Sequence, residues 1–445
     1  MSLVPLLLAC AGSRAGAAAA TGWLFGSTAA LGLVTGWLWP ALTDFFGATL
    51  GVRVGLLGLA SQLGGGVPLA LFGIAAARAA AAGPVARVLL VAAAWTAVEY
   101  ARGRLPYAMP WAPLGAALAP DGAIAQVADL GGVYLVSFVV AVVNAALAFA
   151  WTSGMRNGVR AARTPLVVAA LVLALAAGYG GWRRTHVARQ MAAAPALRVA
   201  LVHAELENAR RQGAAMAAAA FDRYLALSPA GGVDLVVWPE NAVNVLLEDN
   251  PDLVARLAAH AGTTPYVVGA PRAVAGAAGA TLRTSALLIA DGAVRGAYDK
   301  RRLLPFAETM PSLRGGGGAD PRSFVAGDAA SVLTVGGRRL GPLICYEAIF
   351  PDLARATVRG GAELLVNLSN DSWFAAGAGP EQHVRFALLR AVELRRTLVR
   401  AANRGVTTVV LPDGRRPVAT DGASPGVEIA TVPLLGMPTV YGAVG

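Results

Sequence analysis

The chain has 445 residues, of which 56% are hydrophobic and only 14% are charged, and its mean hydropathy is +0.57. These values exclude a wholly water-soluble globular protein and predict a membrane region. The net charge of +11 does not indicate a nucleic-acid-binding protein, because the arginines stand singly between apolar runs and form no basic stripe interleaved with aromatic residues.

The N-terminal half is divided into long blocks without charged residues. Four blocks can each hold the roughly 20 apolar residues that cross a bilayer. They lie between residues 14 and 44, 53 and 78, 129 and 156, and 163 and 183. A shorter block from Arg87 to Glu99 predicts a fifth helix that runs to about Arg102. We therefore expect residues 1–190 to form a transmembrane helical region of about five spans.

The arginines in the short loops predict the orientation of these helices, because such residues accumulate on the cytoplasmic side. The cytoplasmic loops would be those that hold Arg14, Arg78, Arg87, Arg156, Arg160 and Arg163. The last span then leaves the membrane on the outer side near Trp182, although Arg183, Arg184 and Arg189 at that exit argue the other way. We expect the second half of the chain to be extracytoplasmic.

From about residue 195, short β-like runs alternate with helical or glycine-rich stretches, which predicts an α/β domain with layered sheets over residues 195–436 and a tail over 437–445. The predicted strands cover residues 197–202, 233–238, 266–269, 285–289, 340–345, 363–368 and 406–411. The predicted helices cover residues 216–227, 253–261 and 383–402. The glycine run at 315–318 predicts a surface loop.

Three strand ends expected in this domain carry residues with reactive side chains. Glu240, Lys300 and Cys345 each come at or just after the end of a strand. A carboxylate within hydrogen-bond reach can take the thiol proton, and a fixed ammonium favours the thiolate and a later oxyanion. With only two cysteines in the chain, neither a disulfide framework nor a cysteine metal cluster is available. The pattern predicts nucleophilic catalysis without a metal or cofactor.

Lys300 stands out by composition as well. It is the only lysine among the 37 basic residues, and the others are all arginine. A chain that uses arginine wherever either cation suffices retains lysine here, which makes position 300 a candidate for a specific role.

Three motifs carry a resemblance to a known superfamily. W-P-E-N at residues 238–241, Y-D-K-R-x-L-x-P-F-x-E at 298–308 and C-Y-E at 345–347 resemble the motifs of the nitrilase (carbon-nitrogen hydrolase) superfamily. Its fold is an α-β-β-α sandwich with a Glu-Lys-Cys triad. More narrowly, N-L-S-N-D-S-W-F at 367–374 and the apolar half, with Trp95, Glu99, Arg102 and Pro110-Trp111, resemble the apolipoprotein N-acyltransferase family.

This resemblance implies a ping-pong acyl transfer at a bacterial inner membrane, with a periplasmic catalytic domain. Cys345 would take an acyl group from a phospholipid, and the α-amine of an S-diacylglyceryl cysteine on an apolipoprotein would accept it. Glu240 would be general base and acid, and Lys300 would stabilise charge. Glu308, Tyr346 and Glu347 would be auxiliary residues, with a backbone N–H near Tyr346 as an oxyanion donor. No metal or cofactor is implied.

Two other functions are compatible with parts of the sequence. A membrane-anchored nitrilase-type amidase would use the same triad but give the acyl group to water, and a non-catalytic scaffold would tolerate loss of the thiol. Relative to the family, we expect a first transmembrane helix, part of a second and a final helix to be missing. Asn367, Asn370, Asp371 and His383 are expected to be structural.

Overall fold

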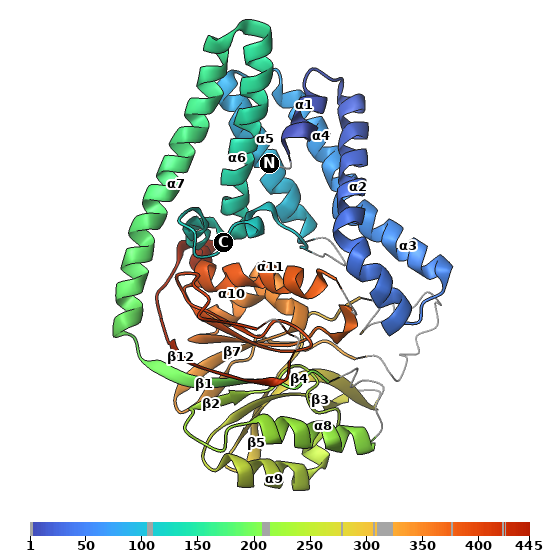
Figure 1. Ribbon diagram of the computed structural model, residues 1–445, viewed down its shortest axis with the longest axis vertical. Helices are drawn as coiled ribbons and strands as arrows, with labels where there is room; N and C mark the ends of the chain where they lie inside the picture. The colour runs from blue at the N-terminus through green and yellow to red at the C-terminus, as the bar shows by residue number, and fades with distance from the viewer. Residues whose placement is uncertain are drawn as a thin grey trace. The chain divides into compact units, whose positions relative to one another are not determined.

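The computed structural model describes residues 3–104, 110–206, 214–276, 279–305, 308, 324–374, 377–420, 422 and 424–445 (Figure 1). The chain forms two compact units. One consists of Met1–His186, Phe374–Leu389 and Val444–Gly445, and the other of Val187–Trp373 and Arg390–Ala443. The first is mainly helical, and the second contains the strands.

Among the residues that the structure describes, five stretches are long and apolar enough to cross a membrane. They are Ala15–Phe45, Leu50–Ala79, Pro84–Arg102, Ile124–Asn157 and Val159–Ala193, the last of which continues into the second unit. The helices are α1 (Val4–Cys10), α2 (Ala15–Pro40), α3 (Leu50–Ser61), α4 (Val67–Ala79), α5 (Pro84–Arg102), α6 (Ala128–Asn157) and α7 (Val159–Ala193). The prediction of five long apolar helices is confirmed.

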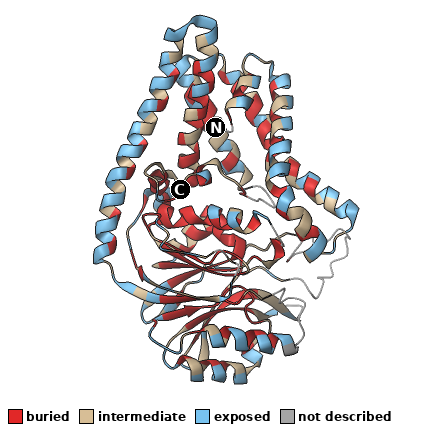
Figure 2. Cartoon of the chain, viewed as in Figure 1, coloured by how far each residue is buried: buried red, intermediate tan, exposed pale blue. Residues whose placement is uncertain are grey.

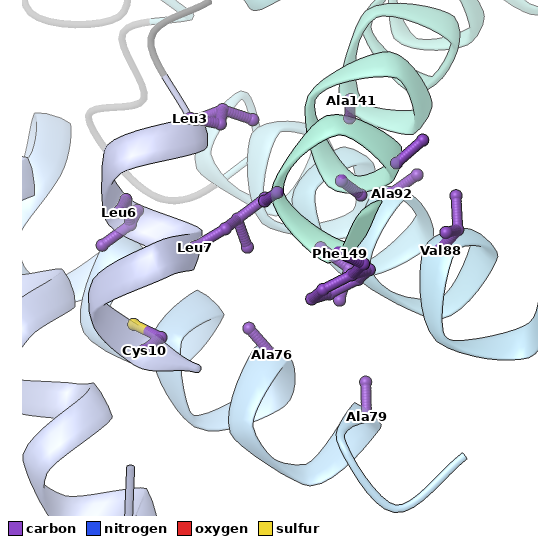
Figure 3. Packing of buried hydrophobic residues seen from close by; sticks show 14 of the residues in the cluster. Leu3, Leu6, Leu7, Cys10, Ala76, Ala79, Val88, Ala92, Ala141 and Phe149 are labelled. Carbon is purple, nitrogen blue, oxygen red and sulfur yellow. The ribbon is translucent and has the colours of Figure 1, made fainter. Parts of the chain in front are cut away.

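Small residues allow the helices of this unit to pack closely. A Cβ atom added at Gly26 in α2 would lie 2.3 Å from the carbonyl oxygen of Gly65, so the two backbones meet directly. Such contacts are typical of helix pairs in membranes. Figure 3 shows the neighbouring core, where Leu7 of α1 and Phe149 of α6 lie among alanine and valine side chains. Cys10 belongs to this core.

The outer surface of the helical unit is apolar. Large side chains such as Leu71, Trp151 and Leu175 are 59%, 65% and 74% exposed. A water-soluble protein would not leave so many large apolar side chains exposed on neighbouring helices, whereas lipid tails cover them without cost. The chain is therefore a membrane protein.

Buried polar groups fix the connection between α5 and α6. Glu99 Oε1 accepts hydrogen bonds from Trp95 Nε1 at 2.8 Å and from the Leu114 backbone N–H at 2.7 Å. Arg102 donates to the carbonyl oxygens of Gly64 at 2.7 Å and Trp111 at 2.8 Å. These residues, which the sequence singled out, anchor the connecting segment to α5.

The α/β unit contains two six-stranded sheets. Their strand orders are β12-β1-β2-β3-β4-β5 and β11-β10-β9-β8-β7-β6. The first sheet contains β1 (Ala196–His203), β2 (Leu235–Val237), β3 (Tyr266–Gly276), β4 (Gly279–Ala290), β5 (Ala293–Asp299) and β12 (Gly426–Pro433). The second contains β6 (Leu333–Val335), β7 (Arg338–Ile344), β8 (Leu364–Asn370), β9 (Thr397–Asn403), β10 (Thr408–Val410) and β11 (Val418–Ala419).

Each sheet has three parallel strands at its centre, β1-β2-β3 and β7-β8-β9. Strands buried on both faces read as continuous apolar runs, and Figure 2 shows the central strands coloured as buried along much of their length. Helices α8 (Ala214–Leu227) and α9 (Pro251–Ala261) pack on the first sheet through Phe221 and Leu257. Helix α10 (Pro351–Arg359) packs against β7. The predicted α-β-β-α sandwich is confirmed.

One predicted helix is wrong in its C-terminal part. Helix α11 (Gly379–Leu394) ends where Arg395 adopts a left-handed backbone with φ 49°, and the chain continues as β9. All seven residues of β9 are buried between β8 and β10, so sheet pairing outweighs the helical propensity of its alanines. Strands β6, β9, β11 and β12 were not predicted, and β5 was expected only as a strand end before Lys300, without a residue range. The predicted loop at 315–318 lies outside the described residues.

Candidate active site

Cys345 stands at the carboxyl end of the parallel strand β7. The chain turns there into a short 3-10 helix, Cys345–Ile349, and Cys345 itself has φ 53°. A left-handed backbone at a non-glycine residue is strained and persists only where its surroundings hold it. The side chain amide of Asn367 in β8 donates to the carbonyl oxygens of Leu343 at 2.8 Å and Cys345 at 3.1 Å. The strand and this amide fix the turn.

The thiol of Cys345 is only 3% exposed. Burial raises the pKa of this thiol, and the carboxylate of Glu240 raises it further, while Lys300 opposes both. The group is therefore a thiol at neutral pH, and a base must remove its proton before it can attack.

Lys300 follows β5 directly and is 2% exposed. Its Nζ donates to Glu240 Oε1 at 2.8 Å and to the carboxylate of Glu308 at 3.0 Å. Burial disfavours the ammonium, but the two carboxylates outweigh that cost and raise the pKa of Lys300 well above its usual value. The side chain is an ammonium ion throughout the physiological pH range.

Glu240 lies three residues beyond β2 and is 3% exposed. The turn that carries it depends on a glycine in the neighbouring strand: a Cβ atom added at Gly269 would lie 2.1 Å from the Pro239 carbonyl oxygen. Trp238, two residues before Glu240, is held in place because its Nε1 donates to Ser228 Oγ at 2.8 Å. The backbone that carries Glu240 is therefore tightly packed, which fixes the position from which its carboxylate contacts Lys300.

Glu347 joins the nucleophile turn to the lysine segment. Its Oε1 accepts the backbone N–H groups of Arg301 at 2.7 Å and Arg302 at 3.1 Å. Its Oε2 accepts the Ile344 N–H at 2.7 Å and the Tyr298 hydroxyl at 2.9 Å. Burial raises the pKa of Glu347, while hydrogen bonds from backbone N–H groups oppose this shift. The carboxylate thus ties the residues flanking Cys345 to those flanking Lys300.

Replacing Glu347 with glutamine is expected to lower the free energy of unfolding by about 1–3 kcal/mol. One carboxylate oxygen is replaced by an amide NH2 group, which cannot accept hydrogen bonds from the buried donors. Thermal unfolding in detergent measures the effect. Glu363→Gln is the matched control, since Glu363 also accepts a backbone N–H, from Arg339 at 2.9 Å, but at a more exposed site. Equal unfolding temperatures for the two variants would contradict this role for Glu347.

The structure brings most of the sequence-predicted residues together. Glu240, Lys300 and Glu308 form one buried ion cluster, and their charges act on the thiol of Cys345. Tyr346 lies beside it, and its hydroxyl donates to the Leu303 carbonyl at 3.3 Å. Sequence reasoning did not recognise the contact of Asn367 with the nucleophile, nor the buried Arg400 that holds this amide. A lone arginine in the apolar run of β9 was the available signal.

The family model described as "Carbon-nitrogen hydrolase" matches residues 188–437. The fold and the cysteine at the strand end define the second unit as a domain of this hydrolase superfamily. A further model, described as "Apolipoprotein N-acyltransferase N-terminal domain", matches residues 1–146. The chain belongs to the apolipoprotein N-acyltransferase family.

Two curated relatives illustrate this membership. An apolipoprotein N-acyltransferase of Geobacter metallireducens is 33% identical over 435 residues, which cover 92% of this chain and 80% of the relative. One of Sinorhizobium medicae is 34% identical over 415 residues, 88% of this chain and 75% of the relative. The chain is also similar to the crystal structure of an amidase from Nesterenkonia sp., with 23% identity, a TM-score of 0.38, and coverage of 55% of this chain and 92% of that one.

Proposed function

We propose that this protein transfers a fatty acyl group from a membrane phospholipid to the α-amine of the S-diacylglyceryl cysteine of an apolipoprotein, through a thioester on Cys345. The observation that carries the proposal is a buried Glu240-Lys300 ion pair beside a cysteine at a strand end, in a chain that also has five apolar helices. Relatives that match most of this chain are named apolipoprotein N-acyltransferases.

In the first half-reaction, Glu240 takes the proton of Cys345 and the sulfur attacks the ester carbonyl of the phospholipid. A C–S bond forms, and negative charge develops on the carbonyl oxygen, where Lys300 and a backbone N–H near Tyr346 stabilise it. The C–O bond then breaks, and Glu240 returns the proton to the leaving alkoxide. The products are an acyl-enzyme thioester and a lysophospholipid.

In the second half-reaction, the α-amine of the acceptor attacks the thioester. Glu240 takes a proton from this amine, a C–N bond forms, and the C–S bond breaks. The proton passes to the departing sulfur, so Cys345 is again a thiol and Glu240 again a carboxylate. Glu308 stays paired with Lys300 and keeps it in place through both steps.

Hydrolysis by a membrane-anchored amidase is the alternative reaction for the same residues. Water would then replace the amine in the second half-reaction. The five apolar helices and the match to the N-terminal domain of the acyltransferases favour transfer, because both substrates carry acyl chains that reside in a bilayer. A site held close to lipid also keeps the thioester away from bulk water.

Intact-mass analysis tests the proposed transfer. After incubation with phospholipid, the purified protein is expected to gain the mass of one fatty-acyl group, which hydroxylamine removes because it cleaves thioesters. Addition of a diacylglyceryl-cysteine peptide is expected to discharge the adduct and acylate the peptide amine. A protein that never gains the mass, or an adduct that yields only free fatty acid when the peptide is present, would contradict transfer.

We also propose that the α/β unit is extracytoplasmic, as the arginines of the short loops indicate. An alkaline phosphatase inserted between the exposed residues Gly231 and Gly232 is expected to be active. The matched insertion lies between Asn157 and Gly158, in the exposed turn from α6 to α7, and is expected to be inactive. The reverse activities would show that the orientation is inverted.

A further inference from the structure

A buried arginine network lies beside Cys345, and the proposed mechanism does not use it. Arg400, in the middle of β9, is fully buried. It donates from Nη1 to Asn367 Oδ1 at 2.5 Å and from Nη2 to Asp371 Oδ2 at 2.7 Å. Its Nε donates to the Val406 carbonyl at 3.3 Å. Burying a guanidinium is costly unless its donors are paired, so the partners of Arg400 decide whether its burial is tolerated.

The first partner connects Arg400 to the backbone of the nucleophile. Because Asn367 Oδ1 accepts from the guanidinium, its Nδ2 must face the other way, where it donates to the carbonyls of Leu343 and Cys345. These are the groups on either side of the strained turn at Cys345, whose φ is 53°. Arg400 therefore fixes which way the amide points, and the amide supports the turn.

The second partner places a charge near the thiol. A carboxylate oxygen of Asp371 lies within 4.8 Å of Cys345 Sγ. Ser369 donates to Asp371 Oδ1 at 2.9 Å, and a Cβ atom added at Gly405 would lie 2.3 Å from Oδ2, so the carboxylate is held in a tight space. Its negative charge acts on the thiol in the same sense as those of Glu240 and Glu308, against Lys300. Without the positive charge of Arg400, Asp371 would disfavour a thiolate more strongly.

We propose that Arg400 is a positioning residue for Cys345: through Asn367 it holds the nucleophile turn, and through Asp371 it cancels a negative charge beside the thiol. The proposal extends the acyl transfer proposed above, since it concerns the same nucleophile. One side chain can serve both functions because its planar guanidinium presents fixed donors to the amide, the carboxylate and a carbonyl at once.

Alkylation of Cys345 by iodoacetamide, followed by peptide mass spectrometry, tests this role without any phospholipid. Cys10 is an internal standard, because it is the other cysteine and is buried in the helical core. In Arg400→Met, we expect Cys345 to react about tenfold more slowly or worse, the size of coupling found within one network, while Cys10 is unchanged. Arg395→Met is the matched control: Arg395 is also fully buried and donates to the Pro412 carbonyl at 2.7 Å.

The double variant Arg400→Met with Asp371→Asn separates charge compensation from general damage. We expect it to regain most of the lost rate, because the negative charge that faced Arg400 is gone as well. The proposal would be overturned if Cys345 in Arg400→Met were alkylated at a rate within about threefold of the parent rate. A rate within about threefold of that in Arg395→Met would overturn it as well. A double variant as slow as Arg400→Met would overturn the role of Asp371.

Unfolding is visible in the same experiment, because it accelerates alkylation of both buried cysteines. If Arg400→Met unfolds, Asn367→Leu tests the proposal instead, because it removes both carbonyl contacts with little change in volume. Slower alkylation of Cys345 but not of Cys10 supports the proposal. An unchanged alkylation rate of Cys345 overturns it. The acyl adduct of the parent is measured in parallel. If the parent protein forms the acyl adduct but Arg400→Met does not change the alkylation of Cys345, only the role of Arg400 is rejected. If the parent protein forms no adduct, only the acyl transfer is rejected.

Discussion

Replacing Cys345 with serine is expected to abolish the hydroxylamine-sensitive acyl adduct. A serine hydroxyl is a much weaker nucleophile than a thiolate, and at this buried site Glu240 would have to deprotonate a group far less acidic than a thiol. The loss is expected to reach the detection limit of intact-mass analysis, which corresponds to at least about a thousandfold in rate.

Cys10→Ser is the control for that variant. Cys10 lies in the helical core and its Sγ donates weakly to the Ala18 carbonyl at 3.9 Å, so serine can keep a hydrogen bond there. We expect this variant to form the adduct at the parental rate. Acylation that persists in Cys345→Ser, or that disappears in Cys10→Ser at equal amounts of folded protein, would show that the thioester does not form on Cys345.

Lys300→Arg is expected to slow thioester formation by about a hundredfold, the equivalent of losing one well-placed contact worth on the order of 3 kcal/mol. The ammonium of Lys300 sits between the carboxylates of Glu240 and Glu308 in a space that leaves the side chain 2% exposed. A guanidinium is larger and fixes its donors in one plane, so it cannot reproduce this arrangement.

The measurement is single-turnover thioester formation at equal amounts of folded, membrane-inserted protein. Arg301→Lys is the reciprocal control in the adjacent residue, whose guanidinium is only partly buried and donates to the Tyr298 hydroxyl at 3.2 Å. We expect that variant to stay within a few-fold of the parent. A Lys300→Arg rate equally close to the parent would show that charge alone matters at position 300.

The sequence was sufficient to predict the elements whose pattern is local. Uncharged blocks predicted the five apolar helices, and alternating elements predicted the layered α/β domain, because both signals extend over many neighbouring residues. The short strands β6 and β11 gave no such signal, since they have only 3 and 2 residues and depend on their partners. The sequence of β9 contains two alanines, which favour a helix, and its pairing with β8 and β10 is not visible from the local sequence.

The candidate site divides in the same way. Glu240, Lys300 and Cys345 were recognisable because each follows a strand in a distinctive motif, and the structure places the first two 2.8 Å apart. The contact of Arg400 with Asn367 joins residues 33 positions apart, and its meaning depends on the amide being turned toward Cys345. Such an arrangement follows from the pairing register of β8 and β9, in which these two residues lie opposite each other.

The ion cluster around Lys300 has a consequence for how charge would be distributed in the proposed reaction. One ammonium and two carboxylates give the cluster a net charge of minus one while Cys345 is a thiol. If Glu240 accepts the thiol proton, the thiolate takes over the negative charge that the carboxylate gives up, and the total is unchanged. The proton therefore moves within the site without any ion entering or leaving a region shielded from water. In the proposed mechanism, activation of the nucleophile is thus an internal redistribution of charge, which avoids the solvation cost of creating a new ion at a buried site.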